Sequence, residues 1–164
     1  MAFAASWVAN NQYTPKNLGD TANGGADVVY LGSEEVIFQS RSNNCGVAAL
    51  LMVLEHHGVK SLQQEIKQRA ELLHRGTSLL ALKELAKRAD LEAEGWRLSF
   101  EDLKKIVFPA ILFIENYHFI VVDSVDGRGV LFVRDPAVGR LAIPRRRMME
   151  IWNGETLVIT RASR

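Results

Sequence analysis

The feature that most constrains this chain is an apolar segment, residues 47–54, in which every side chain is hydrophobic. A helix over this segment has no polar face, so we expect it to be buried near the centre of the fold. The polar run before it, residues 40–44, favours a loop because Ser and Asn side chains compete for backbone hydrogen bonds. We therefore predict a central helix that begins at about Cys45, with Asn43 or Asn44 as its N-cap.

Cys45 is the only cysteine of the chain and would stand at the N-terminal end of this helix. The helix macrodipole places about half a positive charge there, which favours a thiolate over a thiol. A lone cysteine is more often a small buried hydrophobic residue, so its position alone assigns no role. Cys45 is therefore a candidate nucleophile whose function depends on partners elsewhere in the chain.

The composition is that of one ordinary globular domain of 164 residues, 48% of them hydrophobic and 24% charged. A net charge of +1 gives no field that would recruit nucleic acid, so the three arginines at 145–147 are interpreted as a solvated helix face. No apolar run approaches the ~18 residues of a membrane helix. A single cysteine fits a reducing compartment, so we expect a cytoplasmic protein, although an exported protein with a reactive thiol has the same count.

The histidines and the cysteine do not show the ligand spacing of a zinc site, and we predict no metal and no other cofactor. The adjacent pair His56-His57 points in different directions on a helix. Because the pair lies near the end of the central helix, we expect it to interact with the negative end of the helix dipole.

The order of the remaining elements predicts an α+β fold. Residues 1–35 are rich in Gly, Asn and Pro and predict a largely irregular arm, with a short strand near residues 27–31, before a single domain at residues 36–164. Further helices are predicted at residues 61–73, 77–88, 99–107 and 145–152, with Ser61 and Thr77 as N-caps and Leu80, Leu82, Leu85 and Ala86 facing inward. Strands are predicted at residues 109–115, 117–125, 130–134, 141–144 and 156–160. A helical N-terminal half, including the central helix, should thus pack on a C-terminal antiparallel sheet.

A hairpin in the second half places His118 near Asp135. If Asp126-Gly127 forms a two-residue turn, the two residues lie directly opposite each other. A four-residue loop makes them diagonal neighbours on one face, and a three-residue loop puts them on opposite faces. The face of His118 would also carry Ile120, Val122, Leu131 and Val133 and receive the central helix, whereas Phe119, Asp123 and Arg134 would lie on the solvent side.

Taken singly, His118 is an ordinary strand histidine and Asp135 a turn former before a proline. Together with Cys45 they supply a nucleophile, a base that takes its proton, and an acid that orients the base. Gln39 is a candidate for a fourth part, because its side-chain NH₂ can act beside the Cys45 backbone N–H as an oxyanion hole. A surface polar residue remains the alternative for Gln39.

In order and spacing, Gln39, Cys45-Gly46, Tyr117-His118-Phe119 and Asp135-Pro136 resemble the bacteriocin-processing peptidases. These papain-like cysteine peptidases remove double-glycine leader peptides, often as the N-terminal domain of a peptide-exporting ABC transporter. The resemblance covers roughly residues 36–160. It implies a papain-like fold with Cys45 as nucleophile, His118 as general base, Asp135 as orienting acid and Gln39 as oxyanion donor. It also implies a peptide or leader-peptide substrate, an exporter as partner, a narrow cleft beside Cys45 and an apolar groove beyond it.

Three features depart from that family pattern. Asn44 stands where the family usually has Asp or Glu, the arm before Gln39 is longer than usual, and no transmembrane or ATPase segment follows, so we expect a freestanding member or an excised piece. Two other functions stay open. The same triad can attack a glutamine side-chain amide, as in a deamidase or transglutaminase effector, or the cleft can bind peptide without turnover.

Overall fold

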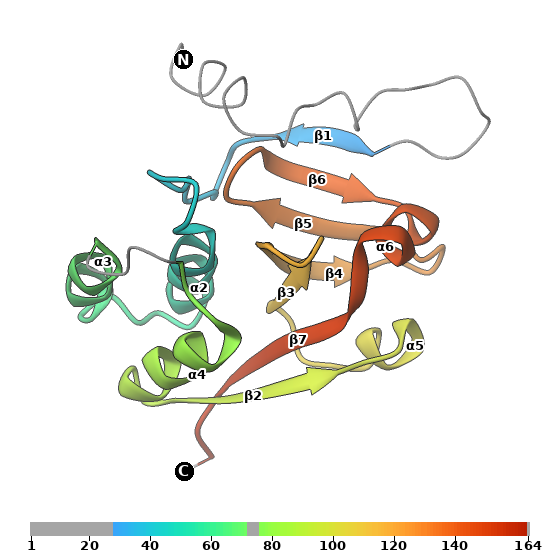
Figure 1. The fold of residues 1–164 in the computed structure, drawn as a ribbon. Coiled ribbons are helices and arrows are strands. Elements are labelled where there is room, and N and C mark those ends of the chain that lie inside the picture. Colours follow the sequence, from blue (N-terminus) through green and yellow to red (C-terminus); the bar gives the residue numbers. More distant parts are fainter. Residues whose placement is uncertain (1–27, 72–75, 164) are drawn as a thin grey trace.

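The computed structural model describes residues 28–71 and 76–163, which form a seven-stranded antiparallel sheet with helices on both faces (Figure 1). The strands are β1 (Val29–Gly32), β2 (Leu91–Arg97), β3 (Ala110–Ile114), β4 (His118–Val125), β5 (Leu131–Asp135), β6 (Gly139–Ile143) and β7 (Trp152–Arg161). The helices are α2 (Cys45–His56), α3 (Gln63–Glu71), α4 (Leu79–Arg88), α5 (Phe100–Leu103) and α6 (Arg145–Ile151). The strand order is β1-β6-β5-β4-β3-β7-β2. The predicted α+β fold is confirmed.

Helices cover the two faces of the sheet in separate groups (Figure 1). On one face α2 and α4 pack against the sheet, and α3 packs against α2. On the other face α5 and α6 pack against a second core. Both faces of the middle strands are therefore dry, and β3 and β4 are apolar along most of their length.

The central helix is buried as predicted, with every residue from Cys45 to Leu54 inside the core. Asn44 occupies the N-cap position, but among the described residues its side chain makes no capping bond. Its Oδ1 accepts from the Arg41 backbone N–H at 3.1 Å, and its Nδ2 donates to Ser40 Oγ at 2.9 Å. The predicted side-chain cap at Asn44 is wrong, because this amide closes the loop before the helix instead.

The central helix packs on the sheet face opposite to the predicted one. Its neighbours on β4 are Phe119 and Val121, whereas Ile120 and Val122 face the core beneath α5 and α6. The prediction treated the face of Phe119 as the solvent side. It failed because both faces of β4 are buried, so the sequence shows no polar alternation that would orient the strand.

The β4–β5 hairpin closes through residues 126–130, and so does not use the two-residue turn at Asp126-Gly127 that was one of the three geometries considered. Val125 pairs with Leu131, and the Asp126 N–H donates across the loop at 3.0 Å. The Asp126 carboxylate accepts two backbone N–H groups of the loop at 2.9 Å each. These bonds stabilise the longer connection.

A bulge in β4 restores the strand register that brings His118 close to Asp135. The register shifts at Asp123, so that Val122 pairs with Val133 farther along the hairpin. This register equals that of the predicted four-residue loop. His118 and Asp135 are therefore diagonal neighbours on one face, as expected for the four-residue loop, and they are not directly opposite each other.

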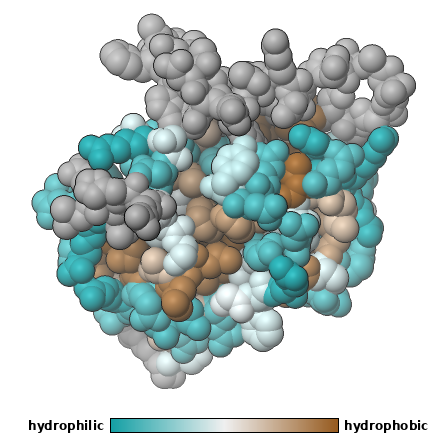
Figure 2. All heavy atoms as spheres, viewed as in Figure 1, coloured by the Kyte–Doolittle hydropathy of each residue, from teal (hydrophilic) through white to brown (hydrophobic). Residues whose placement is uncertain are grey.

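Other element predictions need correction. Strand β2 was not predicted, because Leu91–Arg97 contains Glu, Ala and Gly and alternates apolar and polar residues only at its start. Helix α3 begins at Gln63, after the predicted cap Ser61, and α4 is capped by Ser78, whose Oγ accepts from the Ala81 N–H, rather than by Thr77. Leu80, predicted to face inward, is 66% exposed, and Figure 2 shows hydrophobic atoms at the surface around α2 and α4.

The N-terminal arm is described only in part. Residues 1–27, for which most of the irregular arm was predicted, lie outside the described residues, whereas the predicted short strand is present as β1. In the described ranges, no helix combines the length and the hydrophobicity needed to cross a membrane. The arginines at 145–147 lie on α6 and pair with Glu101 and Glu150, as expected of a solvated helix face.

Candidate active site

Cys45 is the first residue of α2, and its side chain is only 4% exposed. The next residue is glycine for a steric reason. A Cβ at Gly46 would lie 3.0 Å from the Phe119 ring and 3.3 Å from the Leu82 side chain. Glycine thus lets the start of α2 pack closely on β4, and because β4 begins at His118, the sulfur meets the imidazole.

His118 and Asp135 form a buried pair. The distance from His118 Nε2 to Asp135 Oδ1 is 2.8 Å, and the exposed fractions of the two residues are 4% and 0%. Asp135 Oδ1 also accepts from the Ala137 backbone N–H at 2.8 Å, which fixes the carboxylate. Asp135 Oδ2 has no hydrogen-bond partner among the described residues. The Asp135 carboxylate is therefore positioned to orient the His118 ring.

The imidazole of His118 links the carboxylate to the thiol. Since Nε2 faces Asp135, Nδ1 is the ring nitrogen left for Cys45, whose side chain is also a hydrogen-bond partner of His118. Burial lowers the pKa of His118, but the charge and hydrogen bond of Asp135, and then the Cys45 side chain, raise it to about 10. The ring is therefore protonated at neutral pH, and an imidazolium beside the sulfur favours the thiolate.

Gln39 lies against the same loop as the acid. Its backbone N–H donates to the Pro136 carbonyl at 2.9 Å, and the residue is buried. Its side-chain Nε2 donates to the Arg41 carbonyl at 3.0 Å, while Oε1 is buried without a partner among the residues described. The amide nitrogen has a second proton for an oxyanion. Gln39 as oxyanion donor stays a prediction.

Arg134 supports this arrangement and was missed as a site residue. Its guanidinium donates to both Asp123 oxygens, at 2.7 and 2.9 Å, and to the Glu35 carbonyl at 3.2 Å. It therefore ties the end of β5, just before Asp135, to the segment that leads to Gln39. The prediction of a solvent-side Arg134 is wrong because the charge is buried and paired. The opposite charges at 123 and 134 on adjacent strands were the available signal.

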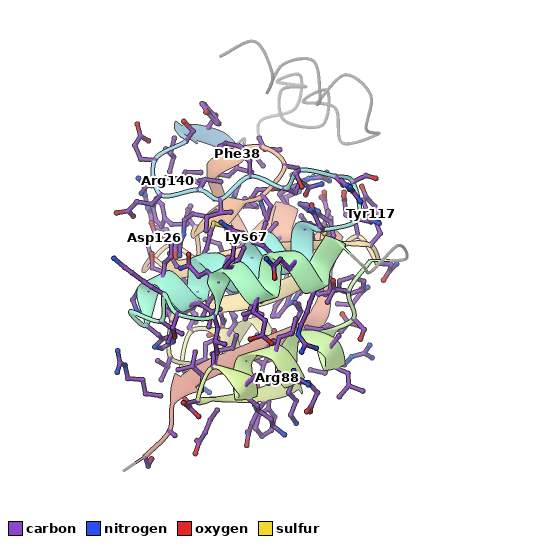
Figure 3. The ribbon with its side chains drawn as sticks, turned by 90° about the vertical axis from the view of Figure 1, so that its left-hand side faces the viewer. Phe38, Lys67, Arg88, Tyr117, Asp126 and Arg140 are labelled. Atoms are coloured by element: carbon purple, nitrogen blue, oxygen red, sulfur yellow. The ribbon has the colours of Figure 1, made fainter. Side chains whose placement is uncertain are left out.

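Tyr117, which is labelled in Figure 3, is largely exposed, and its ring centroid lies 6.4 Å from that of His118. Its hydroxyl donates to Glu115 Oε2 at 2.9 Å. Burial and this carboxylate raise the pKa of Tyr117 to about 12. The phenol therefore stays neutral at physiological pH.

A pocket of about 240 Å³ opens beside the start of α2. It is lined by Ile37, Phe38, Gln39, Ser40, Asn44, Val47, Ala48, Leu51 and Lys67. Figure 3 shows Phe38 on the loop before α2 and Lys67 on α3, on the same side of the molecule. Most of the lining is apolar, and Gln39 is one of its polar residues.

The two histidines at the far end of α2 differ from the prediction. Their rings touch edge to face, with centroids 5.2 Å apart. Burial and the neighbouring charge of His56 lower the pKa of His57, so its cationic form, which the helix dipole would favour, is disfavoured. Within the described residues no group of three or more His, Cys, Asp or Glu side chains is placed to hold a metal ion.

A thiol at the start of a buried helix, facing a strand histidine that an aspartate holds, is the arrangement of papain-like cysteine peptidases. Residues 33–164 match the model of the Peptidase C39 family. The chain belongs to this family, and it is a cysteine peptidase, as the resemblance in its sequence predicted.

Relatives and solved structures agree with this assignment. A protein of Methanothermobacter thermautotrophicus is 34% identical over 131 residues, which cover 80% of this chain and 92% of the relative. The colicin V secretion/processing ATP-binding protein CvaB of Escherichia coli is 28% identical over 76% of this chain, which corresponds to 18% of the relative.

Among solved structures, a double glycine motif protease from an AMS/PCAT transporter, in complex with the leader peptide, has a TM-score of 0.72 and 28% identity. The match covers 86% of this chain and 96% of that protein. The peptidase domain of Streptococcus ComA, at 20% identity and a TM-score of 0.68, shares the fold. The papain-like architecture is therefore confirmed.

Proposed function

We propose that this enzyme cleaves a leader peptide after a Gly-Gly pair, with Cys45, His118, Asp135 and Gln39 as its catalytic residues. The observation that carries the proposal is the buried imidazole of His118, which has Asp135 on one nitrogen and Cys45 as its other partner. The similarity to a double glycine motif protease bound to its leader peptide supports the substrate class.

The reaction is nucleophilic acyl transfer. The Cys45 thiolate attacks the carbonyl carbon of the scissile bond, and the Cys45 backbone N–H and the Gln39 amide donate to the oxyanion. His118 then gives its proton to the leaving amine, and a thioester remains. Water attacks the thioester with His118 as base, which releases the carboxylate product and restores the thiol.

The burial of the site explains why glycine would precede the cut. Both Cys45 and His118 are 4% exposed, so a bulky side chain next to the scissile carbonyl would collide with the walls before the carbonyl reached the sulfur. The apolar pocket beside Gln39 is the proposed position for the apolar side of a leader helix. An exporter that delivers this leader is the proposed partner, and a reducing compartment such as the cytoplasm suits the thiol.

The test is mass spectrometry of a synthetic double-glycine leader peptide incubated with the wild type and with Cys45→Ala. We expect the wild type to release the leader, the variant to leave the peptide intact, and a matched peptide with Val in place of the second Gly to resist cleavage. An intact peptide would overturn the proposal. So would a gain of about 1 Da on a glutamine-containing protein without chain cleavage, because that change indicates attack on a side-chain amide.

A further inference from the structure

The arm before β1 contains the only pair of adjacent glycines in the chain. Of the 12 glycines, only Gly24 and Gly25 are neighbours, and the small residue Ala26 follows them. The pair lies four residues before Val29, where β1 begins. The chain thus carries, ahead of β1 in the sequence, the feature that the proposed cleft would accept.

We infer that this peptidase is its own substrate, and that one copy cuts the Gly25–Ala26 bond of another. The inference rests on the proposed function and extends it to a substrate that the sequence itself supplies. Cys45 of the first copy forms a thioester with the Gly25 carbonyl, and the Ala26 amine leaves with the proton of His118. Water then hydrolyses the thioester, giving a carboxylate at Gly25 and a second product that begins at Ala26.

The described part of the chain favours a cut between copies, because β1 is fixed at the edge of the sheet. It pairs with β6 through Val29↔Ala142 and Gly32↔Arg140. A Cβ at Gly139 would lie 2.7 Å from the Tyr30 ring and from the Gly32 carbonyl, so β1 packs tightly on the start of β6. The segment before Val29 therefore starts from a fixed point.

The distance from Val29 to the active site is too long for a copy to cut its own Gly25–Ala26 bond. Four extended residues reach at most about 14 Å from Val29. Val29 pairs with Ala142 on β6, and Asp135 pairs with Gly139, three residues away on the same strand. Three residues along a strand and two strand spacings across the sheet place Asp135 roughly 14 Å from Val29. The Cys45 side chain is a partner of His118 on β4, which is one strand farther from β1 than Asp135, and β1 runs from Val29 toward the Gly139 end of β6, so the site lies beyond the end of β1 opposite to Val29. The Gly25 carbonyl cannot reach its own sulfur while β1 stays paired.

The burial of the active site restricts which segments of a second copy can bind in it. The sulfur and the imidazole are almost fully covered, so the bound segment must be extended and must lack side chains at the cut. Residues 24–26 precede β1 in the sequence, so a cut there does not require the pairing of β1 with β6 to break. Cleavage at Gly25–Ala26 would leave three residues before Val29 and the pairing of β1 with β6 intact.

The experiment uses the full chain with Cys45→Ala as substrate and a small amount of wild type as enzyme, with intact-mass analysis over time. We expect the variant to lose residues 1–25, at a rate that rises tenfold when the wild type is raised tenfold. Gly25→Val in the substrate chain should slow the cut at least tenfold, whereas the matched control Gly19→Val in the same arm should not change it. Wild type alkylated at Cys45 serves as a second inactive substrate in case Cys45→Ala folds poorly.

Two results would overturn the inference. One is a substrate chain that keeps its first 25 residues while the same enzyme cuts the synthetic double-glycine peptide, which leaves the proposed function standing. The other is a cut of the wild type at a rate independent of its concentration, since that is the kinetics of a cut within one copy. If neither the synthetic peptide nor the arm is cut, the proposed function fails as well.

Discussion

Two histidines at opposite ends of α2 show what makes a buried imidazole part of a chemical site. His118 meets the N-terminal end and His57 follows the C-terminal end. Burial lowers the pKa of both rings. At His118 the Asp135 carboxylate reverses this effect and raises the pKa to about 10, whereas at His57 burial and the charge of His56 leave the pKa lowered.

The difference teaches that neither burial nor contact with a helix end assigns a role to a histidine. His57 has a backbone hydrogen bond with Ile159, a neutral partner that does not offset its desolvation. His118 has a full negative charge at 2.8 Å, which keeps a proton on the ring at neutral pH. A retained proton beside a sulfur is what thiolate chemistry requires.

The largest expected effect contrasts the two rings directly. His118→Ala should lower kcat/KM on a double-glycine peptide by about 10⁴-fold or more, because the thiol loses both its base and its counter-charge. The matched variant His57→Ala should stay within about threefold of the wild type. Losses of similar size in both variants would show that the two histidines do not differ in function.

The second-largest expected effect concerns the Asp135 carboxylate and the pH dependence of Cys45 alkylation. Because the pKa of His118 is raised to about 10, the imidazolium persists at neutral pH, and the rate of Cys45 alkylation should change less than about threefold between pH 6 and 8. In Asp135→Asn the ring loses its charge partner and the sulfur loses the cation beside it, so the rate should rise steeply with pH over the same range. The His57→Gln variant is the control and should keep the flat profile. A steep wild-type profile would contradict the ion pair.

A third effect concerns the close packing that brings the sulfur to the ring. Gly46→Ala forces a Cβ to 3.0 Å from the Phe119 ring and should lower the free energy of unfolding by about 1–2 kcal/mol. The control Gly95→Ala lies on β2, where a Cβ meets no described atom within 4 Å, and should stay within about 0.5 kcal/mol. Chemical denaturation of both variants measures the contrast. Equal stabilities would mean that the start of α2 tolerates a wider spacing from β4.

The smallest effect is the acid sensitivity of the far end of α2. The pKa of His57 is lower in the folded chain than the ordinary 6.5, so stability is present above pH 6.5 and declines as the pH falls. The raised pKa of His118 acts in the opposite sense, with its contribution complete below pH 6.5 and lost toward pH 10. The Tm of His57→Gln should therefore fall less between pH 7 and 5 than the Tm of the wild type, and the two falls should differ by a few °C at most. His56→Gln, measured beside it, tests whether the neighbouring charge contributes.

Much of the site follows from local sequence. The apolar run after Cys45 predicted a buried helix and the polar run before it predicted a loop, so the thiol was expected at a helix start, where the structure has it. The strand that begins at His118 and the strand that ends at Asp135 were likewise predictable from their β-branched residues. These properties depend on residues close together in the chain.

Other features depend on partners that are distant in the sequence. The bulge at Asp123 sets the register of the hairpin, and the second apolar layer decides which face of β4 receives α2. The burial of Arg134 against Asp123 and the Glu35 carbonyl also requires the assembled sheet. Local propensity contains no information about these contacts.

The sequence by itself predicted Cys45, His118 and Asp135 as the reactive side chains and the elements that hold them, because helix and strand periodicity and the chemistry of Cys, His and Asp are local properties. Only the tertiary structure decided that the His118 ring has both the Asp135 carboxylate and the Cys45 side chain as partners, and that β1 pairs with β6, two strands away from β4. The physical reason is that a register and a distance are set by packing between segments, and packing is decided by the whole core at once.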